Sequence, residues 1–134
     1  MVRILLAIDD DVAQARAQTN AIADIVASST GAEVHVLHVF GDNPEGASVQ
    51  QIEAVREASD RLRELGVEVN LLEASGTPAD EIDKFAEEYD VDQICVAGRK
   101  RSPTGKALFG SVTQDVILGT TRPVLVCGSS PPDE

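Results

Sequence analysis

Residues 2–8 read VRILLAI, and three consecutive aspartates, residues 9–11, follow them. Apart from Arg3 this run is apolar, which is typical of a strand buried on both faces of a sheet. Residues 12–29 are rich in alanine and place apolar side chains at helical spacing, so they predict a helix that stops before Gly31. Residues 33–40, EVHVLHVF, predict a second strand. Strand, helix and strand in this order favour two parallel strands joined by a crossover helix.

The same alternation of strands and helices continues to the end of the chain. The further predicted elements are a turn-rich loop at 41–46, a helix at 47–65, a strand at 67–72, a helix beginning at the Thr-Pro-Ala-Asp of 77–80, a strand at 94–97, a loop at 98–109, a helix at 110–118 and a strand at 124–127. In the third helix we expect Thr77 to cap and Pro78 to occupy the first turn. Right-handed crossovers then predict a Rossmann-like α/β fold, with a five-stranded parallel sheet covered by helices on both faces.

Length and composition favour one globular domain. The chain has 134 residues, of which 43% are hydrophobic. We expect residues 1–128 to form the domain and residues 129–134 a short polar tail. With no apolar run of about 20 residues and no signal-peptide pattern at the N-terminus, the sequence predicts a cytoplasmic protein.

The chain is strongly acidic. It has 23 acidic and 11 basic residues, a formal net charge of −12, and only three of the bases are lysines. Such a surface repels nucleic-acid phosphates and anionic lipid, so we expect neither a nucleic-acid nor a membrane partner. Abundant acid with little lysine also indicates adaptation to high salt, where a Debye length of about 3 Å screens the acids from one another.

The cysteines and histidines predict no catalytic or metal centre. Cys95 and Cys127 each lie in an apolar strand-like run, which favours two buried, reduced thiols. His35 and His38 differ by three positions on one strand, so they point to opposite faces and cannot share a metal ion.

One segment reverses the charge of the chain. Four of the eleven bases lie between Arg99 and Lys106, and no acid lies between Asp92 and Asp115. Gly110 would let an anion approach the backbone at the start of the last helix. Ser111, Val112 and Thr113 would then offer free N–H groups, and the helix dipole also favours negative charge there. The alternative interpretation is a solvated basic loop followed by an ordinary helix cap.

Better-known phosphate and phosphotransfer motifs are absent. Gly105-Lys106 ends like a P-loop, but Lys100 stands at the first glycine position and Ala107 at the magnesium-binding serine or threonine.

The acids after strand 1 also occur in receiver domains of two-component signalling, but the third strand ends without the required aspartate. For Asp10 and Asp11 we favour solvated acids that cap the first helix.

The whole chain resembles the universal stress protein family. The matching stretches are RILLAIDD at the start, VLHVF on strand 2, SGTPADEI before helix 3 and the block GRKRSPTGKALFGSVTQDVILGTTRPVLV. Members that bind ATP carry G-x2-G-x9-G-[ST] in this last block. When the motif ends on Gly110-Ser111, its first two glycines fall on Ala97 and Lys100, and Gly98 lies one place from the first.

The resemblance implies strand order 3-2-1-4-5 and an adenine nucleotide, ATP or AMP, bound with or without Mg²⁺. Asp9 and the Val39 backbone would hold the ribose and adenine, and Ser111 and Thr113 the phosphates. The predicted nucleotide-binding set is Ala7, Ile8, Asp9, Val39, Ala97, Gly98, Arg99, Lys100, Gly110, Ser111, Val112 and Thr113.

The resemblance also implies a homodimer formed through the last strand, Arg122 to Cys127. A short apolar edge strand is a plausible pairing surface, although it can instead be a capped or bulged edge. Three functions stay open: a nucleotide-binding stress-response module, a dimeric interaction protein that binds no nucleotide, and a weak ATPase. We see no residues dedicated to catalysis.

Overall fold

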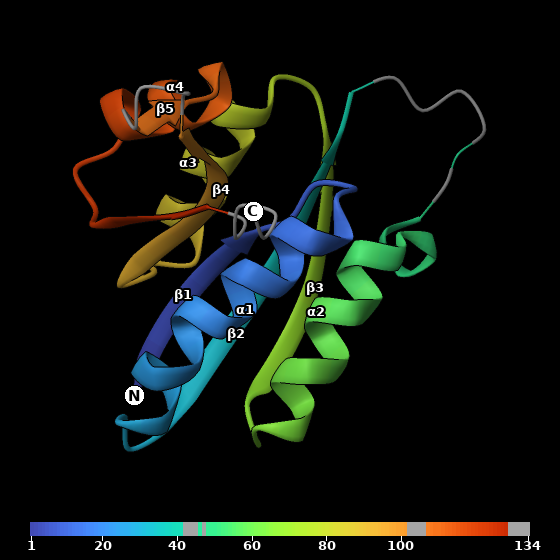
Figure 1. Cartoon of the computed structure of the whole chain (residues 1–134), viewed down its shortest axis with the longest axis vertical. Coiled ribbons are helices and arrows are strands. Elements are labelled where there is room, and N and C mark those ends of the chain that lie inside the picture. Colours follow the sequence, from blue (N-terminus) through green and yellow to red (C-terminus); the bar gives the residue numbers. More distant parts are fainter. Residues whose placement is uncertain (42–45, 47, 102–106, 129–134) are drawn as a thin grey trace.

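The chain folds as alternating strands and helices in the predicted order (Figure 1). The computed structural model describes residues 1–41, 46, 48–101 and 107–128. Its elements are β1 (Val2–Ala7), α1 (Val12–Ala27), β2 (Ala32–Phe40), the 3-10 turn η1 (Val49–Gln51), α2 (Glu53–Glu64), β3 (Glu68–Ser75), α3 (Pro78–Glu88), β4 (Gln93–Arg101), β5 (Ala107–Phe109), α4 (Ser111–Gly119) and β6 (Val124–Gly128).

The predicted parallel sheet is confirmed. Its five parallel strands run in the order β3-β2-β1-β4-β6, which is order 3-2-1-4-5 when the parallel strands alone are counted. The order reverses at β1, because the chain first builds outward through β2 and β3 and then returns to β4 on the other side. β1 and β4 are therefore the strands that flank the topological switch point.

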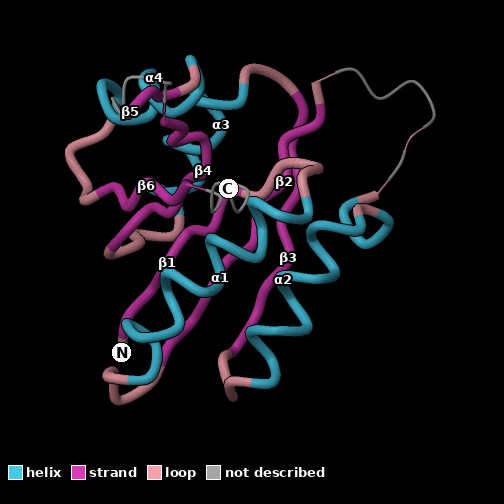
Figure 2. Tube along the Cα trace, in the orientation of Figure 1, coloured by secondary structure: helices cyan, strands magenta, loops and turns pink. Residues whose placement is uncertain are grey.

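Helices cover both faces of the sheet. Helices α1 and α2 lie side by side over one face, while α3 and α4 group on the other, beside the upper end of β4 (Figures 1 and 2). Alternate residues of each strand serve the two faces, as the two-residue period of a strand requires. Ile4 and Leu6 of β1 pack under α1 and α2, whereas Leu5 packs under α3 and α4.

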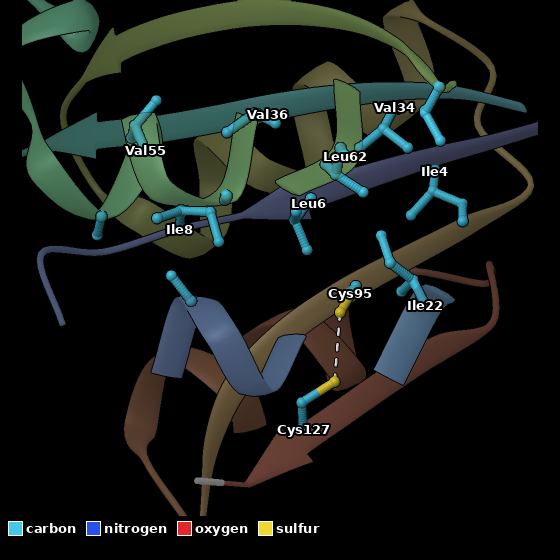
Figure 3. Packing of buried hydrophobic residues seen from close by; sticks show 14 of the residues in the cluster. Ile4, Leu6, Ile8, Ile22, Val34, Val36, Val55, Leu62, Cys95 and Cys127 are labelled. Atoms are coloured by element: carbon cyan, nitrogen blue, oxygen red, sulfur yellow. Dashed lines mark hydrogen bonds between the residues drawn. The ribbon is translucent and has the colours of Figure 1, made fainter. Parts of the chain in front are cut away.

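Two hydrophobic cores result, one on each face. In Figure 3, Ile22 of α1 and the α2 residues Val55 and Leu62 pack against strands β1 and β2. Val55, Leu62 and Ile22 are fully buried, so α1 and α2 are fixed to the sheet by apolar contact.

The cysteines and histidines lie as predicted. Cys95 and Cys127 are both buried and form no disulfide, and their sulfur atoms lie 3.3 Å apart (Figure 3). The hydrogen-bonding contact with the Cys127 thiol, and secondly desolvation, raise the pKa of Cys95 well above its ordinary value. His35 contacts the ring of Tyr89, the residue after α3, whereas His38 contacts the ring of Phe40. Because the two histidines differ by three positions on β2, their side chains point to opposite faces of the sheet.

The prediction for the second helix was wrong at its start. The helix begins at Glu53 and not at Ala47, which lies outside the described residues. A separate 3-10 turn precedes it, closed by the Ser48 N–H donating to the Gln51 side chain over 2.8 Å. Ile52 then adopts an extended conformation, which interrupts the helical path between the two elements.

The predicted loop at 98–109 is in part a β-ribbon. β4 does not end at Ala97 but continues to Arg101, and β5 returns antiparallel beside it, with Arg99 opposite Phe109. The strand continues past a register shift between Ala97 and Arg99, where Gly98 has a φ of 116°. A glycine accepts this backbone conformation, which lets one strand change partners without ending. Residues 102–106 lie outside the described residues.

The N-cap of α1 is as predicted, and the N-cap of α3 agrees with its prediction only in position. The Asp11 carboxylate accepts the Gln14 N–H at 3.2 Å and caps α1, as expected for these acids. Thr77 and Pro78 hold the predicted positions at the start of α3, but the Thr77 side chain makes no capping hydrogen bond.

Candidate nucleotide site

A pocket of about 480 Å³ opens at the carboxyl ends of the central strands. Its lining comes from the end of β1, the second half of β2, the middle of β4 and the starts of α1, α3 and α4. The lining residues are Ala7, Ile8, Asp9, Gln14, Leu37, Val39, Pro78, Ile82, Val96, Ala97, Gly98, Gly110, Ser111, Val112 and Thr113. A pocket of this volume falls in the usual range for small-ligand sites, roughly 300–1,000 Å³.

One wall of the pocket is apolar. Leu37, Ile82 and Val96 are almost fully buried and form its inner surface, and Val39 and Pro78 continue it outward. Such a wall suits a flat apolar or aromatic group, because it removes that group from water and offers no competing polar partner.

The start of α4 contributes polar backbone groups to the lining. Gly110 is the N-cap residue and supplies no side-chain hydrogen bond to the helix. The first N–H groups of an α-helix have no carbonyl partner one turn earlier, and here they belong to Ser111, Val112 and Thr113. No acidic residue occupies the first turn, so the positive end of the helix dipole is left without a local counter-charge.

Gly98 is the residue of β4 that lies against the start of α4. A Cβ placed on Gly98 would lie 2.8 Å from Oγ1 of Thr113, which is closer than real Cβ contacts allow. The Thr113 hydroxyl donates a hydrogen bond to the Ala97 carbonyl at 2.6 Å, and the Gly110 N–H donates to the Gly98 carbonyl at 3.3 Å. These two bonds fix the helix start against the strand end.

The Thr113 hydroxyl has a different partner from the one expected. The family resemblance implied a phosphate, but the side chain is only 2% exposed and already donates to the Ala97 carbonyl. Its hydroxyl therefore shapes the backbone of the pocket, while its N–H belongs to the open first turn of α4.

Asp9 lies at the mouth of the pocket. It stands two residues after the end of β1 and is exposed, and one of its carboxylate oxygens accepts the Asp11 N–H at 2.9 Å. That bond orients the carboxylate and leaves it further acceptor sites for donors such as ribose hydroxyls.

Ten of the twelve residues of the predicted set line this pocket, although the sequence places them in four separate segments. They are Ala7, Ile8, Asp9, Val39, Ala97, Gly98, Gly110, Ser111, Val112 and Thr113. Arg99 and Lys100 belong to β4 by their backbone, and their side chains lie outside the described part of the structure. Sequence reasoning missed Gln14, Leu37, Pro78, Ile82 and Val96, which also line it.

The described residues show neither a metal centre nor a membrane span. Within 1–41, 46, 48–101 and 107–128, no group of three or more His, Cys, Asp or Glu is placed to hold a metal ion. In the same part of the chain, no helix has the length and apolar character that crossing a bilayer requires.

The fold and pocket define a doubly wound α/β domain whose ligand pocket lies at the switch point of the sheet. The model of the universal stress protein family matches residues 1–128, and the chain belongs to that family.

Individual relatives agree with this assignment. Universal stress protein MJ0577 of Methanocaldococcus jannaschii is 37% identical over 65 residues, a match that spans 48% of this chain and 40% of that relative. The structure of a universal stress protein from Archaeoglobus fulgidus has 32% identity and a TM-score of 0.68, and covers 95% of this chain and 98% of that one. A universal stress protein in complex with cAMP has 24% identity and a TM-score of 0.73, covering 96% and 98%.

Proposed function

We propose that the pocket binds an adenine nucleotide, ATP or AMP, and that the chain acts as a regulatory, nucleotide-sensing protein in a stress response. The observation that supports this most is the pairing of an apolar slot with an open helix N-terminus in one pocket. A nucleotide needs both, because its base is flat and largely apolar while its phosphate is an anion. A structurally similar universal stress protein forms a complex with cAMP, and this relative belongs to the same family as our chain.

In this proposal each part of the ligand has its own partners. The adenine enters the slot between Leu37, Val39 and Ile82, and the ribose hydroxyls donate to Asp9. The phosphate accepts hydrogen bonds from the N–H groups at the start of α4, where the dipole adds to the attraction. A magnesium ion that accompanies ATP would neutralise part of the phosphate charge.

Gly110 offers a test that leaves the fold intact. A Cβ at this position meets nothing within 4 Å, and its φ of −69° suits any residue. Gly110→Asp adds a favoured N-cap residue, so we expect the melting temperature to stay the same or rise. The new carboxylate faces the phosphate, however, and we expect the affinity for AMP to fall by about tenfold or more, a loss of at least roughly 1.4 kcal/mol.

Two controls separate charge from shape. Gly110→Asn places a neutral side chain of the same size at the cap, so it should cost AMP much less affinity than Gly110→Asp. Adenosine lacks the phosphate, and its affinity should be similar in the wild type and in both variants. Equal AMP affinity in the Asp and Asn variants, measured by calorimetry, would place the phosphate away from α4 and contradict the proposal.

We further propose that two copies pair through β6. Within the described residues β6 has β4 as its neighbour on one side, so its other edge is the end of the sheet. The Ile94 N–H donates to the Pro123 carbonyl, and in a parallel ladder this register turns the Val126 N–H outward. Val126→Pro should therefore block edge pairing yet keep the contact with β4, and sedimentation should show a dimer for the wild type and a monomer for the variant.

The second candidate function is a dimeric interaction protein that binds no nucleotide. Ala97 favours it, because this residue stands where ATP-binding relatives have the first motif glycine. A wild-type dimer with no heat of binding for any adenine nucleotide would support this second function over the first.

A further inference from the structure

Gln18 of α1 is a polar side chain in the middle of the hydrophobic core. It is fully buried, with 0% exposure, and lies on the helix that covers the sheet beside β1 (Figure 2). Its Nε2 donates to the Ala7 carbonyl at 2.8 Å and to the Cys95 carbonyl at 3.4 Å. Its Oε1 is buried and has no hydrogen-bond partner among the described residues. Because both neighbours are acceptors, the amide must turn its nitrogen toward them.

The two carbonyls belong to the strands that part at the pocket. The ladder between β1 and β4 ends with the pair Leu6 and Cys95. Beyond it β1 continues along β2, where the Ile8 N–H donates to the Leu37 carbonyl, and β4 continues along β6. The pocket opens in this fork, since residues 7–9 line one side of it and residues 96–98 the other.

If this position served only the stability of the fold, glutamine would be an unfavourable residue there. An unpartnered buried oxygen destabilises a folded protein, and an apolar side chain of similar size would fill the space without that cost. The amide instead supplies hydrogen bonds to two carbonyls at the point where the β1–β4 ladder ends. The energetic loss and the location together indicate a role in shaping the pocket.

We propose that Gln18 is a positioning residue of the nucleotide pocket, which bridges the Ala7 carbonyl of β1 and the Cys95 carbonyl of β4 where the ladder between these strands ends, and sets the width of the fork between them. The role in binding rests on the proposed nucleotide function. The width of the fork is a property of the free protein and is tested without ligand. Gln18 contacts no ligand itself and acts through the backbone of Ala7–Asp9 and of Val96–Gly98.

The test is Gln18→Met, which keeps the length of the side chain and removes the amide. We expect an unchanged or higher melting temperature, because the unpartnered oxygen is gone. We expect calorimetry to show about tenfold weaker binding of AMP and of adenosine alike, the loss that one net hydrogen bond of about 1.4 kcal/mol would cause. In the ligand-free protein, hydrogen exchange of the Ile8 and Gly110 amides should be faster, since the Ile8 N–H bonds the Leu37 carbonyl on the β1 side of the fork and the Gly110 N–H bonds the Gly98 carbonyl on the β4 side.

Thr19→Val is the matched control. Thr19 is the next residue of α1 and is 2% exposed, but its hydroxyl donates to the Arg16 carbonyl and accepts from Arg61 of α2, away from the fork. This variant should change stability without changing adenosine affinity or the two exchange rates.

The outcomes distinguish the two proposals. If Gln18→Met showed faster exchange at the fork while the wild type bound no nucleotide, the role of Gln18 would stand and the nucleotide function would be refuted. Unchanged exchange and unchanged affinity in Gln18→Met would overturn the role of Gln18 alone. Gln18→Leu repeats the test with a branched side chain. If neither variant folded, the amide would be a requirement of the core, and this proposal would be wrong.

Discussion

Gly98 is the residue on which the geometry of the pocket depends most. Its φ of 116° disfavours other residues, and a Cβ there would collide with Oγ1 of Thr113. We predict that Gly98→Ala destabilises the fold by about 1–3 kcal/mol from backbone strain, with a further loss from the collision. Urea unfolding measures this loss.

A double-mutant cycle separates the collision from the strain. Thr113→Ala alone should destabilise, because the hydrogen bond to the Ala97 carbonyl disappears. In the double variant the collision is absent. The losses in free energy of unfolding of the two single variants should therefore sum to more than the loss measured for the double variant. Strict additivity of the two losses would contradict the close contact between these residues.

Most of the polar part of the pocket, Gln14 excepted, could be predicted from the sequence, and much of its apolar part could not. Gly98, Gly110 and Asp9 stand out because glycines and acids after apolar runs are unusual. Leu37 and Ile82 resemble any other core residue, and nothing in a linear pattern says that a buried leucine borders a cavity. Two-residue spacing was the available signal for Leu37, since it shares a strand face with Val39.

At the scale of elements, the contact between α3 and α4 contains an unfavourable charge. Asp83 of α3 packs against Gly119, the last residue of α4, and its buried Oδ1 has no partner among the described residues. Burial, and secondly repulsion by Asp80, raise the pKa of Asp83. The negative end of the α4 dipole adds to this repulsion.

We predict that Asp83→Asn raises the melting temperature at neutral pH. An acid whose folded-state pKa is raised binds its proton more tightly in the folded chain, so stability falls as pH rises through that pKa. The advantage of asparagine should therefore shrink as the pH is lowered through the same interval. Asp80→Asn is the control, since Asp80 lies in the first turn of α3 and favours its dipole, and its loss should not stabilise. An advantage of Asp83→Asn that did not change with pH would contradict this explanation.

The existence and order of the five parallel strands and four helices followed from periodicity, and their ends did not. Apolar runs bounded by glycine give strands and helices in the right sequence, as β1 and β2 show. The β4–β5 ribbon was missed because it is short, basic and preceded by a glycine that reads as a strand end. The early start predicted for α2 missed the extended conformation of Ile52, a partly buried residue that packs against the core.

At the scale of the whole molecule, the net charge of −12 predicts a dependence of stability on salt. Repulsion among the acids opposes the compact state, and salt shortens its range from a Debye length of about 10 Å at a tenth molar to about 3 Å at one molar. We predict that the melting temperature rises between dilute and molar potassium chloride. Sucrose serves as the control, because it is excluded from protein surfaces without screening charge. Equal gains in sucrose and in salt of matched osmolality would contradict a screening effect.

The central claim, a pocket that binds an adenine nucleotide, is tested most directly by calorimetric titration of AMP and ATP into the wild-type chain in molar potassium chloride. The fold and pocket predict saturable binding of one nucleotide per chain, together with a higher melting temperature in the presence of ligand. No heat of binding and no thermal stabilisation at millimolar nucleotide would contradict the claim and leave the dimeric interaction protein as the better account.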